Sequence, residues 1–537
     1  MLLRTKRAAV LFGLIAFLLL LDLVQLYGVA SNAEYADKAQ QQIQITLSMP
    51  RERGLILDRS GLPLTPVQPV RYALCVPGEN GYSRLFDHVA YAGQAELYQK
   101  RNALSPFLAE LTKENVPAGI HCYQTSRRAV GIPVAEHLIG YLNGEGSGVS
   151  GLEAAYNELL AGAGDQHRVQ CAVTARGRLV DGLQPVERIS AGSGQSVVTT
   201  LDEPIQRACE GIAVSRMQRG CILVLECATA QVLASVSVPQ YDPQNIAASI
   251  AAADTSLIDR ASAQFSVGSV FKPVLAAAAL EQGLGWYSAE CVGAVEIDGQ
   301  VYRCAKSIAH GTVDLQKGLA QSCNCLFIRL GRVLGGESIL TMAEALGFGS
   351  KTRIAPGWQS SAGVLPAQNT LHNSGQLASL SFGQGQLMAT PLQVAGMMNA
   401  IANGGVYIEP GFVKGIARKN GAMEPVQQMP RRHRAMSEKT AQSLQKMLAG
   451  VITDGIGAEA APQHEAAAGK TGTAQTGRYT EGKDKSEKMD HWFAGFYPAE
   501  NPQYTVVVLQ DEQTQPATGC AAIFAEVCNA IYLLKSN

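Results

Sequence analysis

The stretch that decides the fold is FSVGSVFKPVLAAAAL, residues 265–280. Gly268 predicts a sharp turn, and the Ala- and Leu-rich stretch after it predicts a helix. Pro273 is tolerated because it falls in the first turn of that helix. Ser269 then lies at the helix N-terminus, and Lys272, three residues further on, shares its helical face.

Ser269 and Lys272 form a pair suited to nucleophilic catalysis. A serine hydroxyl becomes a good nucleophile only when a base lies within hydrogen-bond reach. A lysine can be that base when burial or a neighbouring cation lowers its pKa, and the apolar helix body predicts such burial. The helix N-terminus also favours developing negative charge. Taken alone, this SxxK spacing has an ordinary alternative, a capping serine beside a surface lysine.

A second motif, Ser322-Cys323-Asn324, lies between two predicted helical segments, 313–320 and 326–334. A loop tip between two helices can point both polar side chains into a cleft. There Ser322 could relay a proton to a leaving amine, and Asn324 could bind a substrate amide. The alternative is a pair of capping residues in an ordinary turn.

A third motif, Lys470-Thr471-Gly472-Thr473, follows the small-residue run 466–469. It predicts a strand at the inner edge of a sheet, along which a peptide can lie. Gly472 permits close backbone approach, while Lys470 and the threonine hydroxyls suit a carboxylate. The alternative is a polar edge strand without a ligand.

The order of the three motifs is that of penicillin-binding proteins and class A β-lactamases. The chain resembles a class B penicillin-binding protein nearly from end to end. One small departure is Val267, which stands where the family commonly has proline and puts the rigidity of the turn in question. The other segments that carry the resemblance are PQYDPQN (239–245), SFGQGQLMATPLQ (381–393), HWFAGFYP (491–498), RGLILDRSG (53–61) and GVSGLEAAYNELL (148–160).

The resemblance implies an α/β (α+β) fold of the serine transpeptidase and β-lactamase type. It implies an antiparallel sheet flanked by helices, a mixed N-terminal pedestal domain and one transmembrane helix. The implied activity is that of a peptidoglycan D,D-transpeptidase. In this family Ser269 would be acylated by a D-Ala-D-Ala stem peptide, with Lys272 as base and Ser322 and Asn324 as the second motif.

The resemblance also assigns the third motif. Lys470, Thr471 and Thr473 would hold the terminal carboxylate of the substrate, beside Gly472. The backbone N–H groups of Ser269 and Thr473 would form the oxyanion hole.

The N-terminus predicts a membrane anchor. A basic segment, residues 1–7, precedes the apolar run 8–30, which is interrupted by Asp22 and is about long enough to span a bilayer. The basic flank should stay in the cytoplasm, so that the rest of the chain is exported. A cleaved signal peptide, ending at Gly28-Val29-Ala30, is the rival interpretation.

These features predict a cell-membrane protein with a single pass and an extracytoplasmic catalytic domain. The expected parts are a cytoplasmic tail (1–7), a transmembrane signal anchor (8–30), an N-terminal non-catalytic domain of the penicillin-binding protein dimerisation type (31–190) and a transpeptidase domain (191–537).

Composition limits the cofactors and partners. The net charge is −1 and there is no long Lys/Arg run, which argues against a nucleic-acid partner. The twelve cysteines are irregularly spaced, without CxxC or HExxH, so no metal and no cofactor are expected. The arrangement of Cys291, Cys304 and Cys323 looks like that of clostridial and sporulation-type class B members. Disulfide pairing among these three and free buried thiols both stay open.

The expected partners are the peptidoglycan stem peptide as donor and amine acceptor, β-lactams, the cytoplasmic membrane and a membrane glycosyltransferase. One alternative function is a hydrolase of the D,D-carboxypeptidase or β-lactamase type. However, no Glu-x-x-Leu-Asn segment follows the second motif to position a water. Another is a non-enzymatic β-lactam sensor or scaffold, of which a sensor would carry several membrane spans. The sequence leaves open whether the protein serves division, elongation or sporulation.

Overall fold

The computed structural model describes residues 2–34, 37–38, 43–76, 81–113, 115–129, 134–252, 255–425, 429–481 and 485–536. The chain forms two compact units. The first comprises Met1–Arg53, Val67–Val130 and Gly162–Gly194, and the second comprises Gly54–Pro66, Gly131–Ala161 and Gln195–Asn537. The last crossing between them lies close to the predicted boundary at 190/191. The segments 54–66 and 131–161 nevertheless belong to the second unit, and not to an N-terminal domain as predicted.

Long-range pairing explains why these two segments join the second unit. Strand β2 (Ile56–Leu57) pairs in parallel with β8 (Ser196–Thr199), which also pairs with β20 (Val413–Ala417). Leu152 and Leu160 are fully buried in the same hydrophobic core as the helix that follows Ser269. Such contacts join residues far apart in the sequence, which a reading of composition along the chain does not detect.

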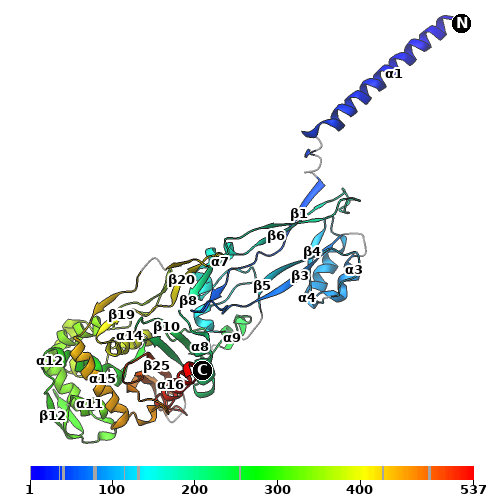
Figure 1. Cartoon of the computed structure of the whole chain (residues 1–537). Helices are drawn as coiled ribbons and strands as arrows, with labels where there is room; N and C mark the ends of the chain where they lie inside the picture. Colours follow the sequence, from blue (N-terminus) through cyan, green and yellow to red (C-terminus); the bar gives the residue numbers. More distant parts are fainter. Residues whose placement is uncertain are drawn as a thin grey trace. The chain divides into compact units, whose positions relative to one another are not determined.

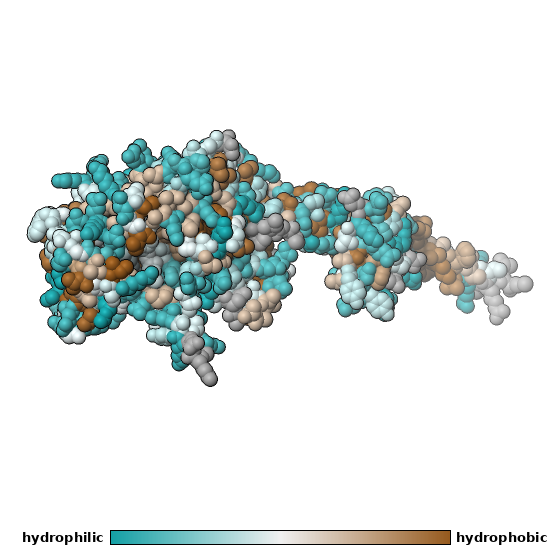
Figure 2. Space-filling model, turned by 90° about the horizontal axis from the view of Figure 1, so that it is seen from below, coloured by the Kyte–Doolittle hydropathy of each residue, from teal (hydrophilic) through white to brown (hydrophobic). Residues whose placement is uncertain are grey.

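The N-terminal α-helix α1 (Leu2–Ser31) is continuous and is not interrupted at Asp22. Its segment Thr5–Ser31 has a mean hydropathy of 2.5 and is long and apolar enough to cross a membrane, with none of it buried in the protein. It is the dark-blue helix of Figure 1, and its surface is largely apolar in Figure 2. These properties match the predicted single-pass anchor.

Besides α1, the described residues of the first unit form two three-stranded antiparallel sheets, one of them accompanied by short helices. The first sheet has the order β1 (Gln44–Ser48), β6 (Gln166–Ala172), β7 (Val186–Ser190), and the second has the order β4 (Phe107–Leu111), β3 (Val67–Cys75), β5 (Cys122–Arg128). Helices α3 (Gly81–Leu85) and α4 (Tyr91–Gln99) accompany the second sheet, and Leu85 and Leu97 are buried in its core.

The second unit is built on a five-stranded antiparallel sheet, as predicted. Its order is β10 (Val232–Val238), β9 (Gly220–Glu226), β25 (Tyr504–Gln513), β24 (Glu487–Tyr497), β23 (Ala468–Tyr479). The central strands are buried on both faces, because they consist of nearly continuous apolar runs such as CILVL and VVVL. Strand β23, which carries the third motif, forms one edge of this sheet.

Helices cover both faces of the sheet. Helices α8 (Glu203–Arg216) and α16 (Cys520–Ser536) pack together over one face. Helix α14 (Pro391–Ala402) packs on the other face, where it contacts β9, β24 and β25. Helix α14 begins with Pro391, and a capping box between Thr390 and Gln393 closes its N-terminus.

A group of helices in the second unit carries the first two motifs. It contains α10 (Lys272–Glu281), α11 (Leu315–Ala320), α12 (Asn324–Ala345), α13 (Ser374–Ser381) and α15 (Glu438–Thr453). Figure 1 shows α11, α12 and α15 gathered at one end of the second unit, with β12 beside them. Helix α10 is alanine-rich and almost wholly buried, with contacts to α12 and α15. The second unit thus buries the lysine of the first motif at the point where α10 begins.

Short elements complete the fold. The helices are α5 (Glu136–Ile139), α6 (Gly151–Ala155), α7 (Asn157–Ala163), α9 (Ile246–Ala252), η1 (Phe86–His88), η2 (Lys100–Asn102), η3 (Gly268–Phe271), η4 (Ala305–Ser307), η5 (Gln368–His372) and η6 (Ala458–Ala460). The strands are β11 (Phe265–Ser266), β12 (Ser288–Cys291), β13 (Ala294–Ile297), β14 (Gln300–Arg303), β15 (Gly311–Asp314), β16 (Arg353–Ala355), β17 (Trp358–Gln359), β18 (Met388–Ala389), β19 (Val406–Ile408), β21 (Met423–Pro425) and β22 (Arg432–Arg434).

Candidate active site

Ser269 lies in a tight turn that leads directly into α10. The turn is the 3₁₀ helix η3, and its first residue, Gly268, has φ +65°. A Cβ at Gly268 would lie 2.5 Å from the Thr473 carbonyl oxygen, so only glycine fits both the backbone angle and the space. Val267, which replaces the usual proline, is fully buried and helical in conformation, so the turn is held by packing.

Lys272 is the first residue of α10 and is fully buried. Its Nζ donates to the Ser322 carbonyl oxygen at 2.7 Å, to Ser322 Oγ at 3.1 Å and to Asn324 Oδ1 at 2.7 Å. These three acceptors match the three protons of an ammonium group. The structure thus brings the first two motifs together in one hydrogen-bonded network.

The environment of Lys272 favours its neutral form more than water does. Burial lowers the pKa of Lys272 to about 7, while the nearby sulfurs of Cys323, Cys304 and Cys325 act in the opposite direction. A base with a pKa near the working pH transfers protons efficiently. Lys272 is therefore chemically able to take a proton from a neighbouring hydroxyl.

The second motif lies where α11 ends and α12 begins. Ser322 is in the loop with φ +52°, a left-handed conformation that costs a non-glycine residue about 1–2 kcal/mol. Asn324 is the first residue of α12, so the loop comprises residues 321–323 and is two residues shorter than the predicted loop, 321–325. The Asn324 amide donates from Nδ2 to the Arg303 carbonyl oxygen at 2.9 Å, which turns Oδ1 towards Lys272. The backbone conformation of Ser322 and the contact of Asn324 with Arg303 therefore fix both side chains.

The third motif lies on β23, at the sheet edge. Lys470 is fully buried, and its Nζ donates to the carbonyl oxygen of Thr471 at 3.1 Å and to Thr471 Oγ1 at 3.3 Å. Burial first, and the charge of Lys272 second, hold the pKa of Lys470 well below its usual range. The two lysines therefore act on one another electrostatically.

Gly472 lets β23 lie against the turn that carries Ser269. A Cβ at Gly472 would lie 2.9 Å from Val270 Cγ1 and 3.2 Å from the Val267 carbonyl oxygen. Thr471 is half-buried, and Thr473 is exposed at the surface of the site. The predicted close backbone approach is therefore present in the structure.

The described part of the site contains two buried amines without an acidic partner. Among the described residues, neither Lys272 nor Lys470 lies within salt-bridge distance of a carboxylate. Also within the described part of the chain, the Ser269 hydroxyl makes no hydrogen bond, so Ser269 and Lys272 are neighbours in the turn but are not directly bonded. Two buried amines without a protein counter-ion favour the binding of an anionic ligand.

Comparison with known proteins shows to which family the chain belongs. Residues 220–532 match the family model described as penicillin binding protein transpeptidase domain. The chain belongs to the penicillin-binding protein transpeptidase family. Stage V sporulation protein D of Bacillus subtilis (strain 168) is 26% identical over 535 residues, which cover 93% of this chain and 80% of that protein.

Further relatives of this chain are class B penicillin-binding proteins. The probable peptidoglycan D,D-transpeptidase PenA of Neisseria meningitidis serogroup B (strain ATCC BAA-335 / MC58) is 25% identical over 543 residues, covering 94% of this chain and 88% of PenA. Among solved structures, the apo form of penicillin binding protein 3 from Mycobacterium tuberculosis has a TM-score of 0.65 and 25% identity. That likeness covers 92% of this chain and 97% of the other. The predicted family and fold are confirmed.

Two residues of this penicillin-binding protein site were not predicted. The carbonyl oxygen of Gly383 accepts from the Gly268 backbone N–H at 2.8 Å, and Gln384 Nε2 donates to the Thr473 carbonyl oxygen at 3.5 Å. Both belong to the segment SFGQGQLMATPLQ, whose resemblance to the family was visible without indicating these contacts. A cluster of cysteines and one histidine also adjoins the second motif, and its residues could hold a metal ion.

Proposed function

We propose that this chain is a peptidoglycan D,D-transpeptidase that works through an acyl-enzyme on Ser269 and is acylated in the same way by β-lactams. The observation that carries the proposal is the set of three hydrogen bonds from buried Lys272 to Ser322 and Asn324. Lys272 comes directly after the turn that carries Ser269. The name of the Neisseria relative supports the same reaction.

In the acylation step, neutral Lys272 takes the proton of the Ser269 hydroxyl. The serine oxygen then attacks the carbonyl carbon between the two terminal D-alanines of a stem peptide. The tetrahedral oxyanion accepts hydrogen bonds from the backbone N–H groups of Ser269 and Thr473. When the C–N bond breaks, Ser322 passes the proton from Lys272 to the departing D-alanine amine. The peptide is left as an ester on Ser269.

In the second step, the amine of another stem peptide attacks this ester. The amine loses one proton, a new amide bond forms, and Ser269 recovers its hydroxyl proton. Both steps use the same base, because Lys272 gives up its proton to the first amine before it accepts one from the second. No cofactor is required for either step.

The third motif binds the substrate. The C-terminal carboxylate of the donor peptide, or the carboxylate of a β-lactam, accepts hydrogen bonds from Thr471 and Thr473 and is attracted by Lys470. The bound anion provides the counter-ion that the described protein residues do not supply. An extended peptide beside the edge strand β23, with Gly472 at its centre, continues the antiparallel sheet.

The proposal extends to the location of the reaction. We infer that α1 anchors the chain in the cytoplasmic membrane, with the catalytic unit outside the cell membrane, because a basic segment precedes the apolar one. A membrane glycosyltransferase would supply the uncross-linked glycan strands. Protease added to intact protoplasts should digest the second unit, and full protection would contradict this orientation.

The test of the reaction uses the full-length protein in detergent. A fluorescent β-lactam should label the wild type, and tryptic mass spectrometry should find the adduct on Ser269. Ser269→Ala should lose the label, whereas Ser215→Ala, which changes an exposed serine on α8, should keep it. Undiminished labelling of Ser269→Ala would refute the assignment.

A second assay separates the transpeptidase from the hydrolase alternative. Peptidoglycan strands with pentapeptide stems are incubated with the enzyme and a labelled D-amino acid as amine acceptor. Incorporation of the label and formation of cross-links support the proposal. Release of D-alanine without incorporation would identify a carboxypeptidase.

A further inference from the structure

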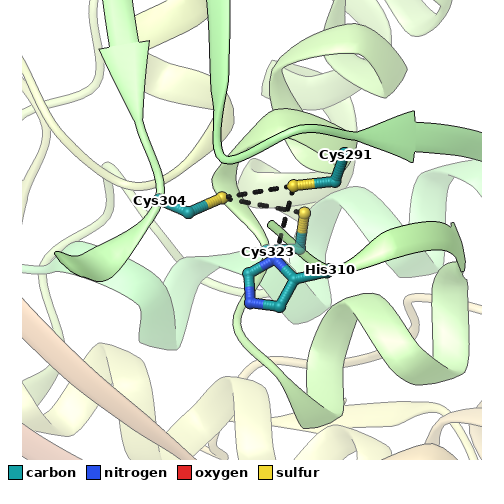
Figure 3. Close-up of side chains that lie close together, drawn as sticks. All are labelled: Cys291, Cys304, His310 and Cys323. Carbon is teal, nitrogen blue, oxygen red and sulfur yellow. Dashed lines mark hydrogen bonds between the residues drawn. The ribbon is translucent and has the colours of Figure 1, made fainter. Parts of the chain in front are cut away.

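Three cysteines and one histidine meet beside the second motif, as Figure 3 shows. We call this group the thiol–imidazole cluster; its members are Cys291, Cys304, His310 and Cys323. Their four ligand atoms all lie within 4.8 Å of one another. The three cysteines are buried, and the histidine is half-buried. The expectation that no metal site exists rested on local Cys spacing, and the structure removes that reason.

The distances within the cluster are those of a metal site. The Sγ atom of Cys304 lies 3.7 Å from that of Cys291 and 3.9 Å from that of Cys323. The distance from Cys291 Sγ to His310 Nδ1 is 3.3 Å. Tetrahedral zinc, with Zn–S near 2.3 Å, separates two ligating sulfurs by about 3.8 Å. A disulfide would require about 2.05 Å, and all twelve cysteines are free.

Secondary structure holds the ligands in place. Strands β12 and β15 pair Cys291 with Gly311, and the backbone N–H of His310 donates to the Cys291 carbonyl oxygen at 3.1 Å. Cys304 follows the hairpin of β13 and β14, which turns at Asp298-Gly299. These ladders fix three of the four ligands before any ion binds.

The fourth ligand joins the cluster to the site. Cys323 is the N-cap of α12 and stands between Ser322 and Asn324, the two residues that hold Lys272. Its Sγ accepts from the Leu326 backbone N–H at 3.4 Å. A metal bound to this sulfur would therefore constrain the loop from which the Lys272 acceptors project.

The chemistry of the ligands selects the ion. Thiolate and imidazole donors suit zinc, and three sulfurs with one nitrogen are a common structural zinc set. The cluster supplies four protein ligands, so the ion needs no water and has no catalytic position. A fourth sulfur, Cys325 Sγ, lies outside the cluster at 3.6 Å from Cys304 Sγ.

We propose that the thiol–imidazole cluster binds one Zn²⁺ ion, and that this ion positions the loop that carries Ser322 and Asn324. Binding converts three thiols into thiolates and releases their three protons, while the histidine binds as a neutral imidazole. No electron transfer is involved. The ion is structural, and its effect on the reaction passes through the loop.

The metal is tested on the full-length protein, purified in detergent under anaerobic conditions without added metal. Elemental analysis should find one zinc per chain. After removal by a chelator, Co²⁺ should restore the site and give thiolate-to-cobalt charge transfer together with the d–d bands of tetrahedral coordination. These readouts do not depend on the proposed activity.

Variants test the ligands. Cys304→Ser and His310→Ala should each weaken zinc binding by more than about a hundredfold, since loss of a ligand exceeds the effect of an outer contact. Cys122→Ser, which changes an exposed cysteine of the first unit, is the matched control and should keep the metal. If Cys304→Ser does not fold, His310→Ala still tests the site, because the histidine is half-buried and its loss opens a smaller defect.

The positioning role has its own measurement. Removal of zinc should increase hydrogen exchange of backbone amides in residues 318–326 and slow β-lactam acylation by about tenfold or more, and added Zn²⁺ should reverse both. The exchange result stands even if the proposed function fails, whereas the acylation result rests on it. Unchanged exchange after chelation would overturn the positioning role.

Three results would overturn the metal site itself. The first is protein that holds no zinc and gives no thiolate band with Co²⁺. The second is a disulfide between Cys291 and Cys304 in the anaerobically purified protein. The third is full zinc content in both ligand variants.

Discussion

The two buried lysines of the site have the same side chain and the same zero exposure, yet their partners differ. Lys272 donates to three oxygens on the second motif, whereas Lys470, among the described residues, donates to two oxygens of the adjacent Thr471. The partners of the first amine lie far away in the sequence, and those of the second lie on its own strand. This difference agrees with the proposed roles, in which Lys272 exchanges protons within the protein and Lys470 receives an anion from outside.

The largest expected effect is at the proton-exchanging lysine. Lys272→Met keeps the shape but removes the base, so the second-order rate constant of β-lactam acylation should fall by about 10²–10⁴-fold. Thermal melting is the control, because methionine removes the cost of burying an amine but leaves the Ser322 and Asn324 oxygens without their donor. An acylation rate close to that of the wild type would show that another group takes the proton from Ser269.

The next effect is at the anion-binding lysine. Lys470→Ala should lower the acylation rate constant by at least about a hundredfold, as expected for loss of an electrostatic contact made in the transition state. Lys470→Arg keeps the charge and should retain part of the activity. Melting temperature is the control, because only a rate loss in a folded protein tests the role. A rate within a few-fold of the wild type would remove Lys470 from the site.

The pH profile sharpens the distinction between the two amines. Burial lowers the pKa of Lys272 to about 7, and only its neutral form can accept a proton. The acylation rate constant should therefore fall about tenfold per pH unit below that pKa and level off above it. The measurement is the rate constant from about pH 5 to about pH 9, with melting followed in parallel. A flat profile would mean that Lys272 does not titrate in the rate-determining step.

The smallest effect concerns the contact between the two sides of the site. Gly472→Ala places a Cβ 2.9 Å from Val270 Cγ1 and should push β23 away from the serine turn. Acylation should slow several-fold, and the free energy of unfolding should fall by about 1–3 kcal/mol, as for other overpacked positions. Gly411→Ala is the control, since a Cβ there meets no atom within 4 Å. Equal behaviour of the two variants would show that the close contact is unimportant.

Local signals in the sequence predicted the parts of the fold that depend on local physics. The turn at Gly268 and the alanine-rich helix α10 after it were predicted because turn and helix preferences act within one or two turns of the chain. The three motifs could be recognised as a set because their order was informative, although none was decisive alone. The catalytic roles of their residues stay a prediction.

Other features depend on long-range pairing and could not be predicted in this way. The parallel pair of β2 and β8 joins residues that flank two segments of the first unit, 67–130 and 162–194, so the two units alternate along the chain. The thiol–imidazole cluster draws its ligands from a strand end, a hairpin end, a loop and a helix cap. Its spacing therefore fits no short motif, and the expectation of no metal followed from searching only for short motifs.

The tightly packed glycines around Ser269 limit how this site can evolve under selection by an antibiotic. A methyl group at Gly383 would overlap the Gly268 carbonyl group, and one at Gly268 would crowd Thr473. Substitutions at either position would damage the turn itself, so they offer no route to drug resistance that preserves cell-wall synthesis. Thr473 is exposed, so a change in its side chain leaves the packing of the turn intact. Resistance mutations should therefore accumulate at the exposed rim of the site and not at the closely packed backbone of Gly268 and Gly383.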